Sequence, residues 1–308
     1  MPVVKPRVIS ALAVATVLAA AAAGACVGEL PPIQVPEIEA DIALPMAEDS
    51  LRFAVIGDAG TGGRQQYDVA AMMAAYHRRF PFDFVLMLGD NLYGAESPDD
   101  YRRKFEVPYA PLLDAGVDFY ASLGNHDDRS QRLYELFNMN DQLFYSFAPD
   151  GHDVRFFALY SDYLDPVQLR WLEAELAGSD ESWKICFFHH PLYSSGGRHG
   201  PDLELRRALE PLFIEYGVDV VFAGHEHFYE RIRPQNGITH FISGAGGKLR
   251  RGDVRADPQT AAKFDDDGSF MLVEIAGLTM FFQAVGRDGQ TVDIGDLPEA
   301  NAANGRNP

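Results

Sequence analysis

Five short fragments of the chain hold most of the side chains that could bind a metal ion, and each follows an apolar, β-rich run. They are Gly57-Asp58-Ala59-Gly60, Gly89-Asp90-Asn91-Leu92-Tyr93, Gly124-Asn125-His126-Asp127, His189-His190-Pro191 and Gly224-His225-Glu226-His227. One Asp-x-Gly fragment alone would indicate no more than a turn. All five in this order, about 30 to 65 residues apart, predict one site assembled at the ends of neighbouring strands. Its donors suit a two-metal hydrolytic centre.

Two metal ions held about 3.5–4 Å apart need one bridging ligand and several terminal ligands. A carboxylate is suited to the bridge because it has two oxygens and a negative charge, and Asp90 is the candidate. The remaining oxygen and imidazole donors belong to Asp58, Asn125, His189, His225 and His227. Donors of this kind favour iron, zinc or manganese over copper(I).

The elements that must position these donors alternate between apolar strands and helices. Strands are expected at residues 53–56, 84–88, 117–123, 154–160, 183–188, 218–223, 238–243, 270–275 and 279–285, and helices at 65–79, 99–115, 166–177 and 202–216. The strand-helix-strand order of the first half predicts a parallel sheet, whereas short turns between the last strands predict antiparallel pairing. Ligands of open α/β sheets bind outside the carboxyl ends of the strands. The donors follow those ends, so the strands would bring them together.

The bulk composition limits which partners the protein can attract. Of the 308 residues, 47% are hydrophobic and 23% are charged, as in ordinary globular proteins. The formal net charge is −19, and so acidic a surface opposes the binding of nucleic acid and of anionic lipid. A phosphate ester would have to be attracted by local positive charge, such as that of metal ions.

The motifs Asp-x-Gly, Gly-Asp-x-x-Tyr, Gly-Asn-His-Asp, His-x-Pro and Gly-His-x-His-x-Tyr-Glu-Arg resemble those of the calcineurin-like metallophosphoesterase superfamily. Within it, they are similar to the purple acid phosphatases, and the distinguishing residue is Tyr93, three positions after Asp90. The resemblance runs from about residue 53 to residue 298 with no large accessory domain before it. The chain therefore looks closest to the small, single-domain tartrate-resistant form. The resemblance implies an α/β fold, a four-layer α/β/β/α sandwich with mixed sheets.

The resemblance also implies roles for single residues. A ferric ion would be held by Asp58, Asp90, Tyr93 and His227, and a second ion, Fe(II), Zn or Mn, by Asp90, Asn125, His189 and His225. The substrate would be contacted by Asn125, His126 and His199. His126 would lie beside the phosphate, and His199 would be a proton donor or a phosphate clamp.

The implied reaction is hydrolysis of phosphate monoesters without a covalent intermediate. A metal-bound hydroxide would attack phosphorus in line while a histidine protonates the leaving alkoxide. Two alternatives stay open. One is a phosphodiesterase or nucleotide phosphatase acting at the same site, and the other is a non-catalytic, surface-tethered binding protein of the same fold. The partner expected for the enzyme is a small phosphate ester, and the oligomeric state is left open.

The N-terminal segment has the form of a signal peptide over residues 1–25. Lys5 and Arg7 precede an apolar stretch, and Ala23-Gly24-Ala25 resembles a cleavage site. Cys26 is either incidental to cleavage or the lipidated first residue of a bacterial lipoprotein. We therefore expect an exported protein, periplasmic, cell-surface or secreted, that contacts a membrane only through a lipid anchor at Cys26.

The rest of the chain divides into three parts. Residues 26–49 are rich in proline and are expected to form a tether. The resemblance assigns residues 50–298 to a metallophosphoesterase domain. Residues 299–308 are polar and are expected to be a disordered tail.

Overall fold

The computed structural model describes residues 33–298. The expected signal peptide, the expected lipidation site at Cys26 and the expected tail lie outside the described residues. Within residues 33–298, no helix is both long enough and apolar enough to span a membrane.

The first sheet contains six strands in the order β13-β12-β11-β1-β2-β3. Its parallel part comprises β1 (Leu51–Ile56), β2 (Phe84–Leu88) and β3 (Asp118–Ser122). The antiparallel part comprises β11 (Ser269–Ala276), β12 (Thr279–Gly286) and β13 (Thr291–Pro298), and β11 pairs with β1. Both the parallel first half and the antiparallel last strands are thus confirmed.

The second sheet contains seven strands in the order β10-β8-β9-β7-β6-β5-β4. Its parallel strands are β5 (Val154–Ala158), β6 (Trp183–Phe188), β7 (Val220–Ala223) and β9 (Ile238–Ser243). The antiparallel strands are β4 (Tyr145–Phe147), β8 (Tyr229–Gln235) and β10 (Thr260–Phe264). The sequence pattern missed β4, β8, β10 and β13, because their charged, exposed or very short stretches do not form an apolar run.

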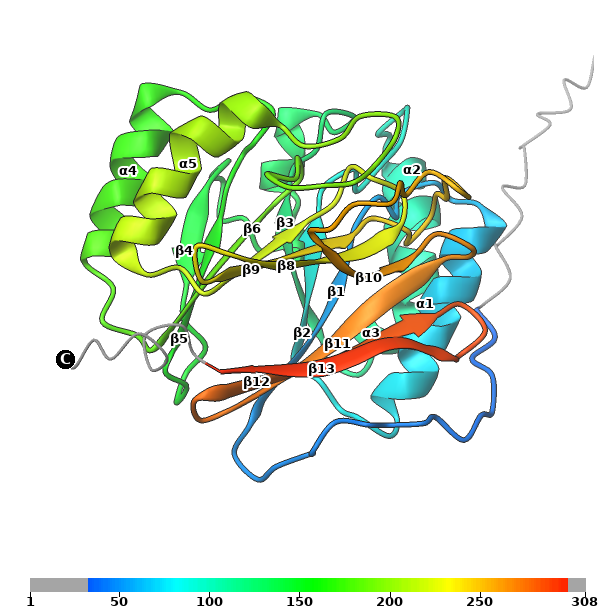
Figure 1. Cartoon of the computed structure of the whole chain (residues 1–308). Helices are drawn as coiled ribbons and strands as arrows, with labels where there is room; N and C mark the ends of the chain where they lie inside the picture. The colour runs from blue at the N-terminus through cyan, green and yellow to red at the C-terminus, as the bar shows by residue number, and fades with distance from the viewer. Residues whose placement is uncertain (1–32, 299–308) are drawn as a thin grey trace, which may run out of the picture. The chain divides into compact units, whose positions relative to one another are not determined.

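Helices cover the outer face of each sheet, so the domain has the four expected layers (Figure 1). Helix α1 (Arg64–His77) and helix α3 (Val107–Leu113) lie against the first sheet. Helix α4 (Pro166–Ala177) and helix α5 (Leu203–Tyr216) lie against the second sheet. The four-layer α/β/β/α sandwich with mixed sheets is therefore confirmed.

The helix expected at residues 99–115 is present as one continuous helical run over residues 98–113, and its middle turn is π-helical. Helix α2 (Pro98–Tyr101) leads into a π-helical turn at Arg102–Glu106, and α3 follows. Pro108 and Pro111 lie in α3. A proline has no N–H to donate to the preceding turn, so a regular α-helix across this stretch would lose hydrogen bonds.

Aromatic rings fill the space between the two sheets. The ring of Phe53 in β1 stacks on that of Phe84 in β2, with centroids 5.2 Å apart. From the second sheet, the ring of Phe156 meets both rings edge-on at 5.3 and 5.4 Å, and Phe222 meets Phe53 at 6.2 Å. Edge-to-face pairs of this kind stabilise a core beyond the area that they bury.

Residues 33–49, expected to be part of a tether, instead pack against the first sheet. The backbone N–H groups of Met46 and Ala47 donate to the buried carboxylate of Glu274 in β11, and Leu44 is buried. The apolar side chains that contact the core belong to Ile33, Val35, Ile38 and Ile42. The proline content of this segment predicted a linker, although its spaced apolar residues pack on the core.

His240 in β9 gives the fold a predicted pH dependence. Its side chain is buried against the ring of Tyr193, at 4.8 Å between centroids, and its Nδ1 has no hydrogen-bond partner. Burial lowers the pKa of His240 to about 3, whereas the unfolded chain has the ordinary value near 6.5. The unfolded state therefore binds the proton first, and the stability that neutral His240 contributes above pH 6.5 is lost as the pH falls toward 3.

We expect the wild-type protein to lose about 2 kcal/mol more of its free energy of unfolding than His240→Phe between about pH 6.5 and pH 5. Urea unfolding of both proteins at the two pH values measures this difference. The comparison cancels the pH dependence that the two proteins share. If both lost the same free energy, His240 would not be buried in its neutral form.

Candidate metal centre

Loops at the carboxyl ends of five strands converge on one site. The first sheet supplies the oxygen donors and the second supplies the imidazoles. The predicted ligands are Asp58 after β1, Asp90 and Tyr93 after β2, Asn125 after β3, His189 after β6, and His225 and His227 after β7. The structure brings all seven together.

One group of donors surrounds the carboxylate of Asp58. Its Oδ1 lies 3.1 Å from the hydroxyl of Tyr93 and 3.3 Å from Nε2 of His227. The Tyr93 hydroxyl lies 3.4 Å from the same His227 nitrogen. Donor atoms of Asp58, Asp90 and His227 all lie within 4.8 Å of one another.

A second group surrounds Nε2 of His189. This nitrogen lies 3.2 Å from Oδ1 of Asn125, 3.1 Å from Nδ1 of His225 and 3.5 Å from Oδ1 of Asp90. The other ring nitrogen of His189 is 2.8 Å from the carbonyl oxygen of Leu88, which fixes the direction of the ring. Asp90 belongs to both groups, as a bridging ligand must.

The backbone around the site is held in conformations that non-glycine residues rarely adopt. Asp58, Asp90 and His225 have φ values of 54°, 51° and 69°. Gly124 and Gly224 approach the carboxylates closely, since a Cβ atom on Gly124 would lie 2.4 Å from Oδ1 of Asp90, and one on Gly224 would lie 2.7 Å from Oδ2 of Asp58. Left-handed backbone at several neighbouring residues is typical of sites whose geometry serves a function.

The charges of the site fit bound metal ions. Burial raises the pKa of Asp58, and the negative charge of Asp90 raises it further. Burial also lowers the pKa of His225 to about 2 and that of His227 to about 3. Neutral imidazoles offer the lone pair that a metal ion needs, and neighbouring buried carboxylates need a cation to offset their repulsion.

The phenol of Tyr93 fits the same conclusion. Burial, followed by the charges of Asp58 and Asp90, raises the pKa of Tyr93. A metal ion bound beside these carboxylates would offset their charge and favour loss of the phenol proton. With two carboxylates, one phenol, one amide and three imidazoles, the donor set suits two ions of iron, zinc or manganese.

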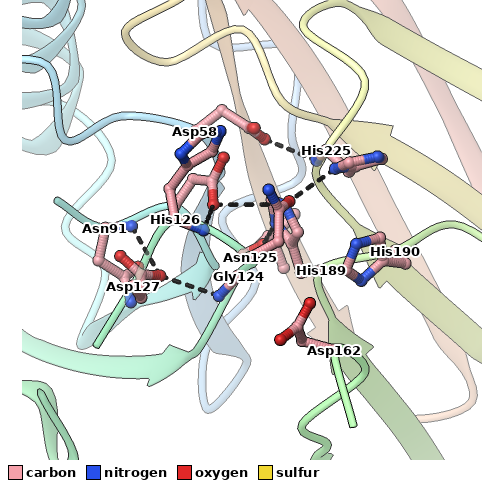
Figure 2. Close-up of polar contacts among 12 residues, drawn as sticks. Asp58, Asn91, Gly124, Asn125, His126, Asp127, Asp162, His189, His190 and His225 are labelled. Carbon is pink, nitrogen blue, oxygen red and sulfur yellow. Dashed lines mark hydrogen bonds and ion pairs between the residues drawn. The ribbon is translucent and has the colours of Figure 1, made fainter. Parts of the chain in front are cut away.

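Asp127 connects the loops that follow β2 and β3. Its carboxylate accepts hydrogen bonds from the backbone N–H groups of Asn91 (3.1 Å) and Gly124 (2.9 Å) (Figure 2). It also accepts one from the backbone N–H of Leu92 (3.0 Å). A side-chain donor, Nε2 of Gln131, lies 2.8 Å away. The carboxylate thereby positions the flanking residues Asp90 and Asn125.

Replacing Asp127 by Ala is expected to weaken metal binding about 10- to 100-fold, as loss of such supporting contacts does elsewhere. It should also destabilise the metal-free protein by roughly 2–4 kcal/mol, because backbone N–H groups lose their acceptor. Metal titration and thermal unfolding measure the two effects. Asp128→Ala is the matched control, since exposed Asp128 accepts a hydrogen bond from Ser130 outside the site. Equal effects of the two substitutions would contradict the prediction.

A cavity of about 350 Å³ opens beside the donors. Its wall includes the predicted substrate contacts Asn125, His126 and His199 together with Asp90, Arg198, His225, His227, Lys248, Leu249 and Arg250. The backbone N–H of His126 donates a hydrogen bond to Oδ1 of Asp90 at 3.0 Å. The ring of His199 lies 4.4 Å from that of His225. The two predicted catalytic histidines thus line one space next to the proposed ligands.

Glu226 has a role that the sequence did not reveal. Its buried carboxylate, between His225 and His227 in the chain, accepts a hydrogen bond from the N–H of Gly200 at 2.7 Å. It also accepts one from Nη1 of Arg250 at 3.1 Å. Glu226 thereby fixes the loop that carries His199. No short motif signals such a contact, because its partners lie 24 and 26 residues away.

His190, which follows the predicted ligand His189, lies at the edge of the site (Figure 2). A donor nitrogen of His190 falls within a group that also contains donors of His189 and His225. Its Nδ1, however, lies 3.0 Å from Oγ of Ser161, whose hydroxyl also accepts from the N–H of His190. The contact with Ser161 orients the ring, which supports the flanking imidazoles.

Comparison with known proteins gives consistent results. The sequence model described as calcineurin-like phosphoesterase matches residues 51–229. Purple acid phosphatase 17 of Arabidopsis thaliana is 30% identical over 276 residues, which cover 76% of this chain and 80% of the relative. Tartrate-resistant acid phosphatase type 5 of Homo sapiens is 26% identical over 300 residues, which cover 82% of this chain and 92% of the relative.

Solved structures show the same fold. A purple acid phosphatase from yellow lupin seeds, PPD1, superimposes with a TM-score of 0.70 at 19% identity and covers 83% of this chain and 55% of its own. GAP50, described as the anchor in the inner membrane complex of Plasmodium, gives a TM-score of 0.73 at 19% identity and covers 81% of this chain and 89% of its own. At these identities the likeness establishes the fold alone.

Proposed function

The chain belongs to the calcineurin-like phosphoesterase family and is a phosphatase-type hydrolase, and we propose that it cleaves phosphate monoesters at a dinuclear metal centre. One observation carries the proposal. Two groups of donors share Asp90 and lie beside a cavity lined by His126 and His199. All of the donors expected for two ions are present, which favours an enzyme over a binding protein of the same fold.

The assignment of ligands follows the two groups. A ferric ion would be held by Asp58, Asp90, Tyr93 and His227, and a divalent ion of iron, zinc or manganese by Asp90, Asn125, His189 and His225. When bound, such ions supply Lewis acidity and lower the pKa of water enough for it to attack phosphorus.

The chain's own residues complete the reaction. Asn125 and His126 lie in the wall of the cavity where the phosphate would bind, and the N–H of His126 ties this residue to Asp90. His199 also lines the cavity, and the loop that carries it is fixed by Glu226. A ring nitrogen of His199 can therefore give a proton to the leaving oxygen.

The proposal is tested with protein reconstituted with iron and zinc. We expect turnover of para-nitrophenyl phosphate to exceed that of the bis ester across about pH 4 to 9, and metal-stripped protein to be inactive. A strong preference for the diester would support the phosphodiesterase alternative. Metal-loaded protein that turned over neither ester would support the binding-protein alternative.

The identity of the ligand to the ferric ion has a spectroscopic test. Iron-loaded protein is expected to absorb broadly in the visible region, because a phenolate bound to ferric iron transfers charge to the metal. Tyr93→Phe should lose this band while retaining part of the iron. Tyr120→Phe is the control, since Tyr120 lies in β3 and stacks on Phe147 away from the donors. An iron-loaded wild type without colour would mean that Tyr93 serves only in packing.

A further inference from the structure

The loop between β6 and α5 that carries His199 takes its order from contacts with other segments. Its residues 194–200 are mostly serine and glycine and belong to no helix or strand. The side chain of His199 is exposed where it lines the cavity. Other residues must therefore hold the imidazole in place for proton transfer, because a misplacement of about 1 Å can cost roughly 100-fold in rate.

The first anchor of this loop is Glu230 in β8, whose carboxylate is buried. Its Oε2 accepts a hydrogen bond from the backbone N–H of Ser195 at 3.0 Å, and its Oε1 accepts one from Oγ of the same serine. Oγ1 of Thr260 in β10 also donates to Oε1 of Glu230, at 2.6 Å. Within residues 33–298, no lysine or arginine forms an ion pair with Glu230, so its buried charge is satisfied by these donors.

The second anchor is Glu226, which accepts the N–H of Gly200 at 2.7 Å. Between the two anchors, Gly196 forms an isolated β-bridge with Val254. Gly196 passes so close to Glu226 that a Cβ atom on this glycine would lie 2.3 Å from Oε1 of the carboxylate. The two buried glutamates thus hold both ends of the segment 195–200.

We propose that Glu230 is a positioning residue for His199. Its carboxylate does not line the cavity, but it fixes Ser195 and thereby the direction of the imidazole four residues later. This inference rests on the proposed function and adds a residue to its mechanism. A glutamine at position 230 would keep one acceptor oxygen but would place an NH₂ group against a donor of Ser195 or Thr260, so the segment would lose its first anchor.

Kinetics of the iron- and zinc-loaded protein test the inference. Glu230→Gln should lower kcat/KM for an alkyl phosphate about 10- to 100-fold, and should lower that for para-nitrophenyl phosphate much less. Adding Glu230→Gln to His199→Asn should cause little further loss, because the first residue acts through the second. A role of Glu230 in folding alone would change neither the ratio of the two esters nor this coupling.

Glu274→Gln is the matched control. Glu274 in β11 is also buried, and its carboxylate accepts hydrogen bonds from the backbone N–H groups of residues 46 and 47 and from Oγ of Ser50. None of these residues lines the cavity. The control should destabilise the protein by removing part of a buried carboxylate network, yet it should leave the ratio of the two esters unchanged.

Ser195→Ala is a second variant that tests the same anchor if Glu230→Gln does not fold. It removes the hydroxyl donor to Glu230 but keeps the hydrogen bond from the backbone N–H of residue 195. We expect the ratio of the two esters to change in the same direction as in Glu230→Gln, by a smaller factor. An unchanged ratio in both variants would overturn the inference.

Amide hydrogen exchange of the metal-loaded protein tests the anchoring without turnover. Amides of the segment 195–200 should exchange roughly tenfold faster in Glu230→Gln, as expected for the loss of one hydrogen bond to a charged group, whereas those of β9 should not change. Unchanged exchange in this segment would overturn the inference, whatever the rates of hydrolysis.

The outcomes separate the inference from the proposed function. Losses that add in the double variant would overturn the positioning role while leaving the phosphatase intact. Equal losses for both esters in Glu230→Gln would do the same where His199→Asn distinguishes between them. If the metal-loaded wild type hydrolysed neither ester, the proposed function would fail, and the exchange measurement would still decide whether Glu230 holds the loop.

Discussion

Replacing Asp90 by Asn is expected to lower kcat/KM for para-nitrophenyl phosphate by roughly 10⁴-fold or more, because bound metal ions contribute several kcal/mol to the transition state. Asp90 is the residue common to both groups of donors. An amide has neither the negative charge nor the second oxygen that a bridging carboxylate provides. Oδ1 of Asp90 also accepts the N–H of His126. The substitution should therefore disturb both ions and the phosphate contact together.

Metal analysis and steady-state kinetics measure the effect of Asp90→Asn, and fewer than two ions per chain should remain. Asp83→Asn is the control, because Asp83 is an exposed residue that precedes the other end of the same strand, β2. A variant that kept two ions and near-normal turnover would show that Asp90 is not the bridge.

Replacing His199 by Asn is expected to slow alkyl phosphates far more than para-nitrophenyl phosphate. General acid catalysis contributes ~10²–10⁴-fold, and a nitrophenolate leaving group needs little protonation. His126→Asn should slow both esters alike, because His126 is tied to Asp90 and would contact the phosphate itself.

Rates for an alkyl and an aryl ester give the ratio that distinguishes these roles. His152→Asn, in the loop between β4 and β5, is the control and should change neither rate. Equal losses for both esters in His199→Asn would identify His199 as a phosphate clamp, and the proton would then come from another group.

Most of the site could be located from the sequence because each donor is marked locally. Asp58, Asp90 and His225 each follow a glycine at the end of an apolar run, and parallel strands bring such ends together. The structure places all three in left-handed backbone, which the sequence did not specify.

Features that depend on distant contacts could not be predicted in this way. The bond from Gly200 to Glu226 and the contact of Lys248 with Tyr93 join loops of unrelated sequence. Strand β8 was missed because buried Glu230 interrupts its apolar pattern. The carboxylate of Glu230 accepts a hydrogen bond from the backbone N–H of Ser195. The segment 33–49 was misassigned because its partner, Glu274, lies more than 200 residues later.

The division of donors between the sheets links metal binding to folding. In the proposed assignment, neither ion finds a complete set of ligands on one sheet, since oxygen donors come from the first and imidazoles from the second. Each ion would therefore join the two sheets, which also contact each other through the aromatic rings between them. An ion at about 1,000 times its dissociation constant adds ~4 kcal/mol to the free energy of unfolding. The supply of metal would thus determine how long the folded protein persists as well as how fast it turns over substrate.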